Sequence, residues 1–496
     1  MNFNSIQYFI FLPIVASVYF LIPYQFRFLW LLLASCCFYM AFIPVYILIL
    51  FLLICVDYLM GIFIENAQGS LRKIYLIISI LTTCSILFTF KYFNFFNANL
   101  THFAQLIHWN YSVKDLSLIL PLGLSFHTFQ SLAYVIEVYR GKWKAERNFG
   151  IYALYVMFFP QLVSGPIERP QHLLPQFSER HDFDYQRITD GLKLILWGLF
   201  QKVVIADRLA LIVNQVYGNL PQYQGLPLLI ATVFFAFQIY CDFAGYTDIA
   251  IGSAQLLGFR LMRNFNQPYF ATSIADFWRR WHISLSTWFR DYVYISLGGN
   301  KTSKLRWTFS IMITFMISGL WHGANWTFLI WGFLHGFYYM FSSWTKCLRE
   351  KITEISNLKE NPFIQHFVRI LITFSLVSFA WIFFRASSLK EAVYIITHLF
   401  NGWDQALVWN DQQAGYIGLS KLEFLGALLS IVFLLIVQAL EQNLSKKTES
   451  TTSISNTLSF LNQKPIFLRW AVYIIITLTI MNLGILTNVP FIYFQF

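Results

Sequence analysis

The sequence predicts an all-α protein that crosses a membrane several times. Hydrophobic residues make up 57% of the 496 residues, and charged residues make up only 12%. Soluble proteins carry about 25% charged residues, so a water-soluble fold of this composition would lack the polar surface that it needs. The apolar residues also gather in uncharged runs of helix length. These observations exclude a disordered scaffold, a disulfide-rich secreted module and a soluble enzyme with one membrane anchor.

A helix needs about 20 apolar residues to cross the hydrocarbon core of a bilayer, and runs of this kind predict about eleven or twelve membrane helices. The first run precedes Arg27, the first Lys or Arg of the chain, so it lacks the positive start of a signal peptide. Because positive charge follows this run, we expect the N-terminus outside the cytoplasm. The runs lie at residues 9–24, 28–56 (divided by Pro44), 74–90, 116–136, 148–167, 192–205, 209–241 (with a loop at 218–225), 307–345 (two helices), 370–384, 424–440 and 470–496.

Charge is concentrated in one segment. The chain has a formal net charge of +11, and residues 260–306 hold eight Lys or Arg against two Asp. This block lies between hydrophobic runs, so cytoplasmic placement beside anionic lipid headgroups explains it better than nucleic-acid binding. The six cysteines show no metal-ligand spacing, and we expect no metal site and no disulfide framework.

Residues 268–299 are too charged to cross the bilayer and too aromatic for an ordinary loop. Alternating steps of four and three predict one apolar helical stripe, made of Ile274, Trp278, Trp281, Leu285, Trp288 and Tyr292. Such a segment lies at the interface or re-enters the protein. It is either an amphipathic belt or the lining of a cytoplasmic mouth. In the second case, arginines of the segment would bind the phosphates of an acyl-carrying cofactor, because guanidinium groups match phosphate oxygens.

The hydrophobic segment 307–345 contains His322 and His335 without a compensating charge. A titratable group at membrane depth is a functional candidate by default. Gly319 and Gly323 form a G-x-x-x-G pair that favours close helix packing, and Asn325 is placed to orient the His322 ring. The alternative is a histidine that serves only packing. As a base, a neutral imidazole suits the removal of a proton from an attacking hydroxyl.

Asp242 and Asp248 form a second polar group at membrane depth. We expect Asp242 to pair with Tyr246, one helical turn away. These carboxylates either pin a broken helix, which we favour, or provide the proton site of a transporter.

Several motifs are similar to those of the membrane-bound O-acyltransferase (MBOAT) family, and the closest branch is that of the bacterial alginate O-acetylases and peptidoglycan O-acetyltransferases. The likeness extends from the first hydrophobic run to about residue 400. The motifs are at residues 121–141, 159–167, 277–286, 289–292, 297–300, 318–326 and 381–386, together with the segment around Asp242.

The resemblance implies one integral membrane domain over residues 1–496, with a family core at 110–400 that contains segments 260–306 and 307–345. It implies an MBOAT fold, in which membrane helices and re-entrant or interfacial helices surround a central tunnel. It assigns catalysis to His322, as the base, and to His282, which polarises the thioester or positions the donor. The donor-binding residues are then expected to be Arg279, Arg280, Trp281 and Asn325.

The implied reaction moves an acetyl group from a cytoplasmic thioester to an extracytoplasmic cell-envelope polysaccharide. Acetyl-CoA or another acetyl thioester would be the co-substrate, and no tightly bound cofactor is expected. The expected partners are membrane lipids and a periplasmic or surface esterase-like acetyltransferase, and the expected location is the bacterial inner membrane. The alternatives are D-alanyl transfer to teichoic acid, a proton-coupled exporter or flippase that uses Asp242 and Asp248, and a structural subunit of a polymer-modifying complex.

Overall fold

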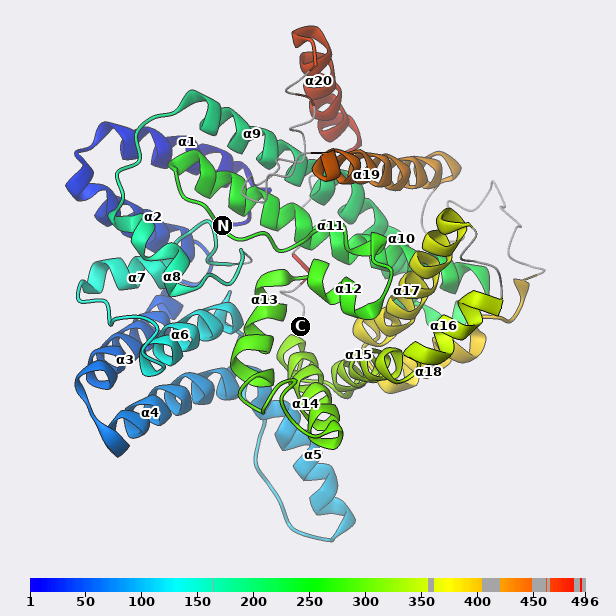
Figure 1. Cartoon of the computed structure of the whole chain (residues 1–496), viewed down its shortest axis with the longest axis horizontal. Helices are drawn as coiled ribbons and strands as arrows, with labels where there is room; N and C mark the ends of the chain where they lie inside the picture. The colour runs from blue at the N-terminus through cyan, green and yellow to red at the C-terminus, as the bar shows by residue number, and fades with distance from the viewer. Residues whose placement is uncertain are drawn as a thin grey trace. The chain divides into compact units, whose positions relative to one another are not determined.

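The computed structural model describes residues 1–163, 165–355, 361–403, 420–447, 461, 464–485 and 491–492. Within these ranges the chain forms helices and no β-strand (Figure 1). The prediction of an all-α, multi-pass membrane protein is therefore confirmed. Six described helical segments are long and apolar enough to cross a membrane: Pro44–Asn66, Gly69–Leu106, Leu226–Leu257, Pro362–Arg385, Lys421–Asn443 and Ile466–Leu483.

The count of eleven or twelve spans is not reached by length and composition alone, because several expected spans are shorter or interrupted. Helix α1, for example, has 16 residues and α2 has 14. Pro44 does divide the second hydrophobic run, as expected, because α2 ends at Met40 and α3 begins at Ile47. The end of the last expected run, at residues 486–490 and 493–496, lies outside the described residues.

The chain divides into two compact units. The first unit contains residues 1–195 and 249–262. Its helices are α1 (Ile6–Leu21), α2 (Arg27–Met40), α3 (Ile47–Asn66), α4 (Gly69–Leu87), α5 (Phe93–Leu106), α6 (Leu124–Tyr139), α7 (Phe149–Met157), α8 (Pro170–Leu173) and most of α9 (Tyr185–Leu199).

The second unit contains residues 196–248 and 263–496. Two short π-helical segments belong to it, η5 (Phe200–Ala206) and η8 (Arg290–Tyr294). Its α-helices are α10 (Asp207–Gly218), most of α11 (Leu226–Leu257), α12 (Ile274–Arg280), α13 (Ile283–Phe289), α14 (Lys304–His322), α15 (Trp326–Trp344), α16 (Lys346–Ile355), α17 (Pro362–Arg385), α18 (Leu389–His398), α19 (Lys421–Lys447) and α20 (Ile466–Leu483).

Helices α14 and α15 form a tightly packed hairpin in the second unit. A Cβ atom added to Gly319 would lie 2.2 Å from the carbonyl oxygen of Phe328, and one added to Gly332 would lie 2.4 Å from that of Phe315. Both positions therefore require glycine, since the backbones meet there without space for a side chain. The hairpin is also capped locally, because the Asn325 side chain accepts a hydrogen bond from the backbone N–H of Thr327 at the start of α15.

A buried ion-pair cluster joins other parts of the second unit. The Lys202 ammonium lies 2.6 Å from Asp242 and 2.8 Å from Asp207, and all three side chains are at most 4% exposed. Asp242 also accepts a hydrogen bond of 2.7 Å from the backbone N–H of Ile492. Helix α11 runs unbroken through Asp242, so the expected broken helix was wrong. The carboxylate instead holds η5 and residue 492 against an intact helix, and its ionic partner is Lys202.

The glycine contact predicts that Gly319→Ala lowers the free energy of unfolding by about 1–3 kcal/mol, because the added methyl group forces α14 and α15 apart. Thermal melting of the detergent-solubilised protein measures this loss. Gly426 in α19 provides the matched control, since a Cβ there meets no atom within 4 Å. Gly426→Ala should be neutral or stabilise by up to about 1 kcal/mol. Equal effects of the two substitutions would contradict the assigned role of the hairpin contact.

The ion-pair cluster predicts that Lys202→Met costs about 3–5 kcal/mol, because two carboxylates then remain buried without a compensating cation. Melting temperature again provides the readout. Arg180→Met is the control, since the Arg180–Asp182 pair is exposed and worth at most about 1 kcal/mol. A Lys202→Met protein that melts like wild type would show that the cluster does not stabilise the fold.

Candidate active site

The aromatic segment predicted as one helical stripe is two short helices, α12 and α13, separated at His282. His282 adopts a left-handed backbone conformation, with φ of 41°, so the α-helix cannot continue through it. The segment around Asn264 binds the interrupted backbone: the N–H of Ile283 donates to the Asn264 carbonyl at 2.9 Å. The Asn264 side chain accepts from the hydroxyl of Ser284 at 2.6 Å. The predicted single stripe is therefore corrected to two helices with a sharp change of direction.

His282 is fully buried at this break. Its ring centroid lies 4.6 Å from that of Phe243 and 6.2 Å from that of Trp321. The segment lies outside the six membrane-spanning helices, and burial lowers the pKa of His282, which favours the neutral imidazole. A neutral ring can accept a proton or donate its single N–H to a reacting group.

His322 is the last residue of α14 and is only 3% exposed. Its ring centroid lies 4.8 Å from that of Trp321, 5.0 Å from Trp331 and 5.2 Å from Phe384. Trp321 therefore contacts both His282 and His322, so the structure brings the two predicted histidines into one neighbourhood with an indole between them.

Asn325 is engaged elsewhere. Its amide nitrogen donates to the carbonyl of Ser387 at 2.9 Å, and its amide oxygen caps α15. Both ends of the amide thus serve the backbone, and no hydrogen bond from Asn325 to the His322 ring is present among the described contacts.

A cavity of about 560 Å³ opens beside these helices. Its walls come from α12, α13, η8, α14 and α15, and they include Arg279, Arg290, Trp278 and Ser318. Ser318 lies one helical turn before His322 on α14. The two guanidinium side chains are 72% and 60% exposed, in contact distance of Asp276 and Asp291 respectively. The cavity therefore combines exposed arginines with a polar and aromatic wall, and the buried His322 follows one of its lining residues by one helical turn.

The residues predicted to bind the donor have different surroundings in the structure, and not all of them line the cavity. Arg279 lines the cavity, whereas Arg280 does not belong to its lining and binds Asp276 through Nε at 3.0 Å. Trp281 is 1% exposed and packs in an aromatic core, 5.1 Å from both Phe265 and Trp381. The geometry thus favours Arg279 for the donor and packing roles for Trp281.

Arg290 was not among the predicted donor residues, although a signal for it exists in the sequence. Residues 279, 283, 286 and 290 follow steps of four, three and four, and all four line the cavity. After the break at His282, the steps of three and four from residue 283 through 286 to 290 place these residues on one face of α13 and η8, and this spacing is the signal for Arg290.

The carboxylates considered for proton transport have fixed partners. Asp242 pairs with Lys202, as described above, rather than with Tyr246. Asp248 accepts a hydrogen bond of 2.7 Å from the side-chain amide of Gln201. Both groups thus connect η5 to α11. Within the described residues, no group of three or more His, Cys, Asp or Glu side chains is placed to hold a metal ion.

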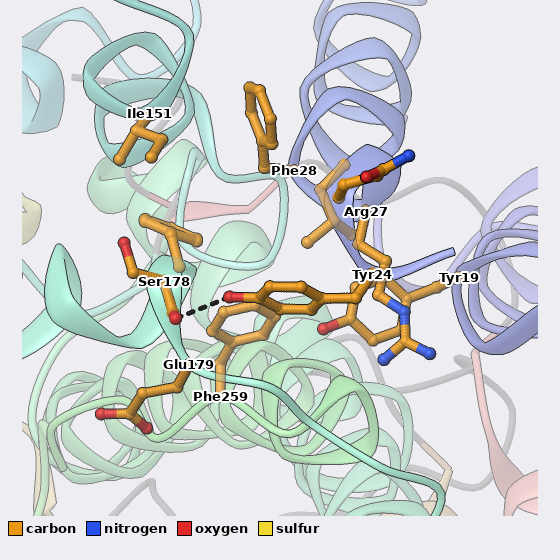
Figure 2. Close-up of a pocket in the computed structure, with 11 residues that line it drawn as sticks. Tyr19, Tyr24, Arg27, Phe28, Ile151, Ser178, Glu179 and Phe259 are labelled. Carbon is orange, nitrogen blue, oxygen red and sulfur yellow. Dashed lines mark hydrogen bonds between the residues drawn. The ribbon is translucent and has the colours of Figure 1, made fainter. Parts of the chain in front are cut away.

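A second, smaller cavity of about 200 Å³ lies in the first unit (Figure 2). Five of its eleven lining residues are aromatic, and Tyr19, Phe28 and Phe259 are among them. The Tyr24 hydroxyl donates to the Ser178 carbonyl at 2.6 Å, and Arg27 donates to the His181 carbonyl at 2.6 Å. Its tyrosine and arginine thus bind backbone oxygens, and neither candidate histidine lines it.

The upstream motif at residues 159–167 also lies in the first unit, next to a buried carboxylate. Glu168 accepts hydrogen bonds from the backbone N–H of Met262 and from Nδ1 of His172. This contact raises the pKa of His172. Glu168 therefore ties the motif to the segment that follows α11, and its role is structural.

Comparison with known proteins agrees with this geometry. The sequence profile described as MBOAT, membrane-bound O-acyltransferase family, matches residues 144–385, a range that holds both histidines and the whole cavity lining. The chain is 33% identical to the probable alginate O-acetylase AlgI of Pseudomonas aeruginosa over 99% of both chains. It is 34% identical to the peptidoglycan O-acetyltransferase of Helicobacter pylori over 78% of this chain and 77% of that protein.

A more distant similarity is limited to part of the chain. The teichoic acid D-alanyltransferase of Streptococcus thermophilus is 33% identical over 42% of this chain and 54% of its own length. The acetylases match 99% and 78% of this chain and the family profile extends across the site, so the chain belongs to the membrane-bound O-acyltransferase family and is an O-acyltransferase.

Proposed function

We propose that the protein transfers an acetyl group from a cytoplasmic acyl thioester to a hydroxyl on the other side of the membrane, for O-acetylation of an extracytoplasmic cell-envelope polysaccharide of alginate or peptidoglycan type. The observation that carries this proposal is the burial of His322 one helical turn after Ser318, which lines a cavity together with Arg279 and Arg290. The relatives named as acetylases of alginate and peptidoglycan support the acyl group and the polymer class.

His322 acts as the general base in this proposal. It takes the proton of the acceptor hydroxyl as the oxygen attacks the thioester carbonyl carbon, so that a C–O bond forms. The C–S bond then breaks, and the proton passes from the imidazolium to the leaving thiolate. The products are an acetyl ester and a free thiol. The aromatic rings around His322 exclude water and thereby protect the thioester from hydrolysis.

The donor is acetyl-CoA or another acetyl thioester, which reaches the site from the basic side of the membrane. Arg279 and Arg290 line the cavity with exposed guanidinium groups that fit phosphate oxygens. His282, at the break between α12 and α13, positions the thioester or polarises it.

The remaining features of the proposal concern location and partners. The protein resides in the bacterial inner membrane with its N-terminus outside the cytoplasm, in contact with membrane lipids. The acetyl group passes through the protein while the bulky donor stays on the cytoplasmic side. A periplasmic or surface esterase-like acetyltransferase then receives it and delivers it to the polysaccharide. Acetyl transfer is favoured over D-alanyl transfer because the matched D-alanyltransferase aligns with less than half of this chain.

The assignment of His322 predicts that His322→Ala lowers ester formation by about 10²–10⁴-fold, the usual contribution of a general base. The measurement is mass spectrometry of groups released by mild base from envelope polysaccharide, in a deletion strain that carries wild-type or variant protein. Membrane amounts of each protein are compared by immunoblot. His366→Ala, at an exposed position of α17, is the matched control and should resemble wild type.

Three outcomes would contradict parts of this proposal. Equal acetate release from wild type and His322→Ala would remove His322 from the chemistry. Released D-alanine would move the protein to the teichoic-acid reaction. Loss of function in Asp242→Asn, with normal membrane amounts and much function left in His322→Gln, would favour the proton-coupled exporter.

The cavity predicts that Arg279→Gln and Arg290→Gln each raise the KM for acetyl-CoA by about 10-fold, with kcat little changed. The reason is that a hydrogen bond to a charged group contributes about 1.5–3 kcal/mol. Membrane vesicles that contain the protein and its acceptor allow both constants to be measured. Arg280→Gln tests whether the donor is bound by Arg279 and Arg290, which line the cavity, or by Arg279 and Arg280, as the sequence predicted. A larger effect on the KM at Arg280 than at Arg290 would contradict the cavity-based assignment. Arg349→Gln, an exposed charge on α16, controls for the lost positive charge.

A further inference from the structure

Three side chains of one aromatic cluster, of which Trp331 contacts His322, have buried N–H donors without an acceptor among the described residues. They are the indole Nε1 groups of Trp331 and Trp381 and the imidazole Nε2 of His335. Each of the three side chains is 0% exposed. A buried indole N–H normally finds a partner. Leaving such a donor unpaired costs about 1–3 kcal/mol, so three in one place need an explanation.

The three donors belong to one cluster. The Trp331 and Trp381 rings are stacked with centroids 5.8 Å apart, and His335 lies 4.9 Å from Trp331 and 6.4 Å from Trp381. Trp331 also lies 5.0 Å from His322. We call Trp331, His335 and Trp381 the donor cluster. It draws on α15 and α17, and it adjoins the base of the proposed reaction.

The tautomer of His335 follows from its one hydrogen bond. The Trp278 indole N–H donates to Nδ1 of His335 at 3.3 Å. Because an indole nitrogen can only donate, Nδ1 carries a lone pair, and the hydrogen of the neutral ring is on Nε2. All three unpaired atoms of the cluster are therefore donors, and their combined preference is for an oxygen that carries negative charge.

The donor cluster is connected to the cavity. Trp278 lines the cavity and contacts the cluster, with its ring 5.7 Å from Trp331 and 4.9 Å from His335. Ser378, one turn before Trp381 on α17, also has an unpaired buried hydroxyl, but a hydroxyl accepts as readily as it donates and indicates no charge preference.

Building on the proposed function, we propose that the donor cluster stabilises the acyl carbonyl oxygen during transfer at His322. As the acceptor oxygen attacks the carbonyl carbon, the π electrons of the C=O bond move onto this oxygen and give it negative charge. N–H groups of Trp331, Trp381 and His335 donate to it. When the C–S bond breaks, the electrons return to form the ester carbonyl, and the thiolate receives the proton held by His322. Donors fixed in a dry site contribute most where charge develops.

The test replaces each indole by a ring without a donor, in Trp331→Phe and Trp381→Phe. We expect each variant to lower the rate of acetyl-ester accumulation by about 10²-fold, the effect of losing one such donor. Its melting temperature should be unchanged or higher, after correction for the lost ring volume, because the substitution removes an unpaired buried donor. Trp197→Phe supplies this correction, since Trp197 is 2% exposed and packs against Phe200 and Phe433.

The two readouts separate the possible roles. Lost activity with preserved stability supports the donor cluster. Activity within threefold of wild type overturns it, and so does a fall of activity together with a fall in melting temperature greater than that of Trp197→Phe. If the wild-type strain itself forms no acetyl ester, the proposed function fails as well. If the wild type is active and both Phe variants remain active, only the inference about the donor cluster fails.

Discussion

The backbone contact between α14 and α15 determines the arrangement of the groups around His322. Gly319 meets the Phe328 carbonyl and Gly332 meets the Phe315 carbonyl, so neither helix can slide or rotate against the other without a clash. His322 is three residues beyond the first contact, and Trp331 directly precedes Gly332. The imidazole and the indole are therefore held in ring contact by two glycines that perform no chemistry. One further turn along α15 places His335 in the same group of rings.

The site concentrates polar atoms in a region that is otherwise aromatic. Such burial is unfavourable unless the surrounding packing compensates for it. Here the compensation comes from large fully buried rings, among them Trp281, Trp331 and Trp381. In the proposed reaction, the same rings would keep water away from the thioester and lower the local dielectric constant, which strengthens every dipole aimed at the reacting atoms. Stability and catalysis thus draw on the same side chains.

Much of this arrangement is predictable from the sequence because it depends on local pattern. The hairpin at residues 307–345, the need for small residues at Gly319 and Gly323, and the burial of His322 follow from hydropathy and spacing. The break at His282 does not, because the steps of four and three continue in phase through Trp281 and conceal it. Its cause is a hydrogen bond from Ile283 to Asn264, which periodicity cannot detect.

One of the remaining differences concerns a contact between distant residues, and two concern local contacts with more than one reading. Lys202 and Asp242 are forty positions apart, and helical spacing predicts contacts only between near neighbours. It therefore indicated Tyr246, one turn away, as the partner of the carboxylate. Asn325 directly precedes an apolar run and fits the pattern of a helix N-cap, yet its closeness to His322 suggested that it orients the imidazole ring. Arg279 and Arg280 both contact Asp276, and only the folded chain reveals that Arg279 lines the cavity whereas Arg280 does not.

The contact between Asp242 and residue 492 has a consequence for biosynthesis. The two positions are 250 residues apart. At the usual speed of translation, the ribosome needs roughly 10–50 s to bridge that interval. Asp242 must therefore enter the bilayer long before its last hydrogen-bond donor exists. Lys202 precedes it along the chain and is already available, so the ammonium can accompany the carboxylate during insertion. Because Lys202 is synthesised before Asp242, the carboxylate has an ionic partner in the membrane until the backbone N–H of Ile492 has been synthesised.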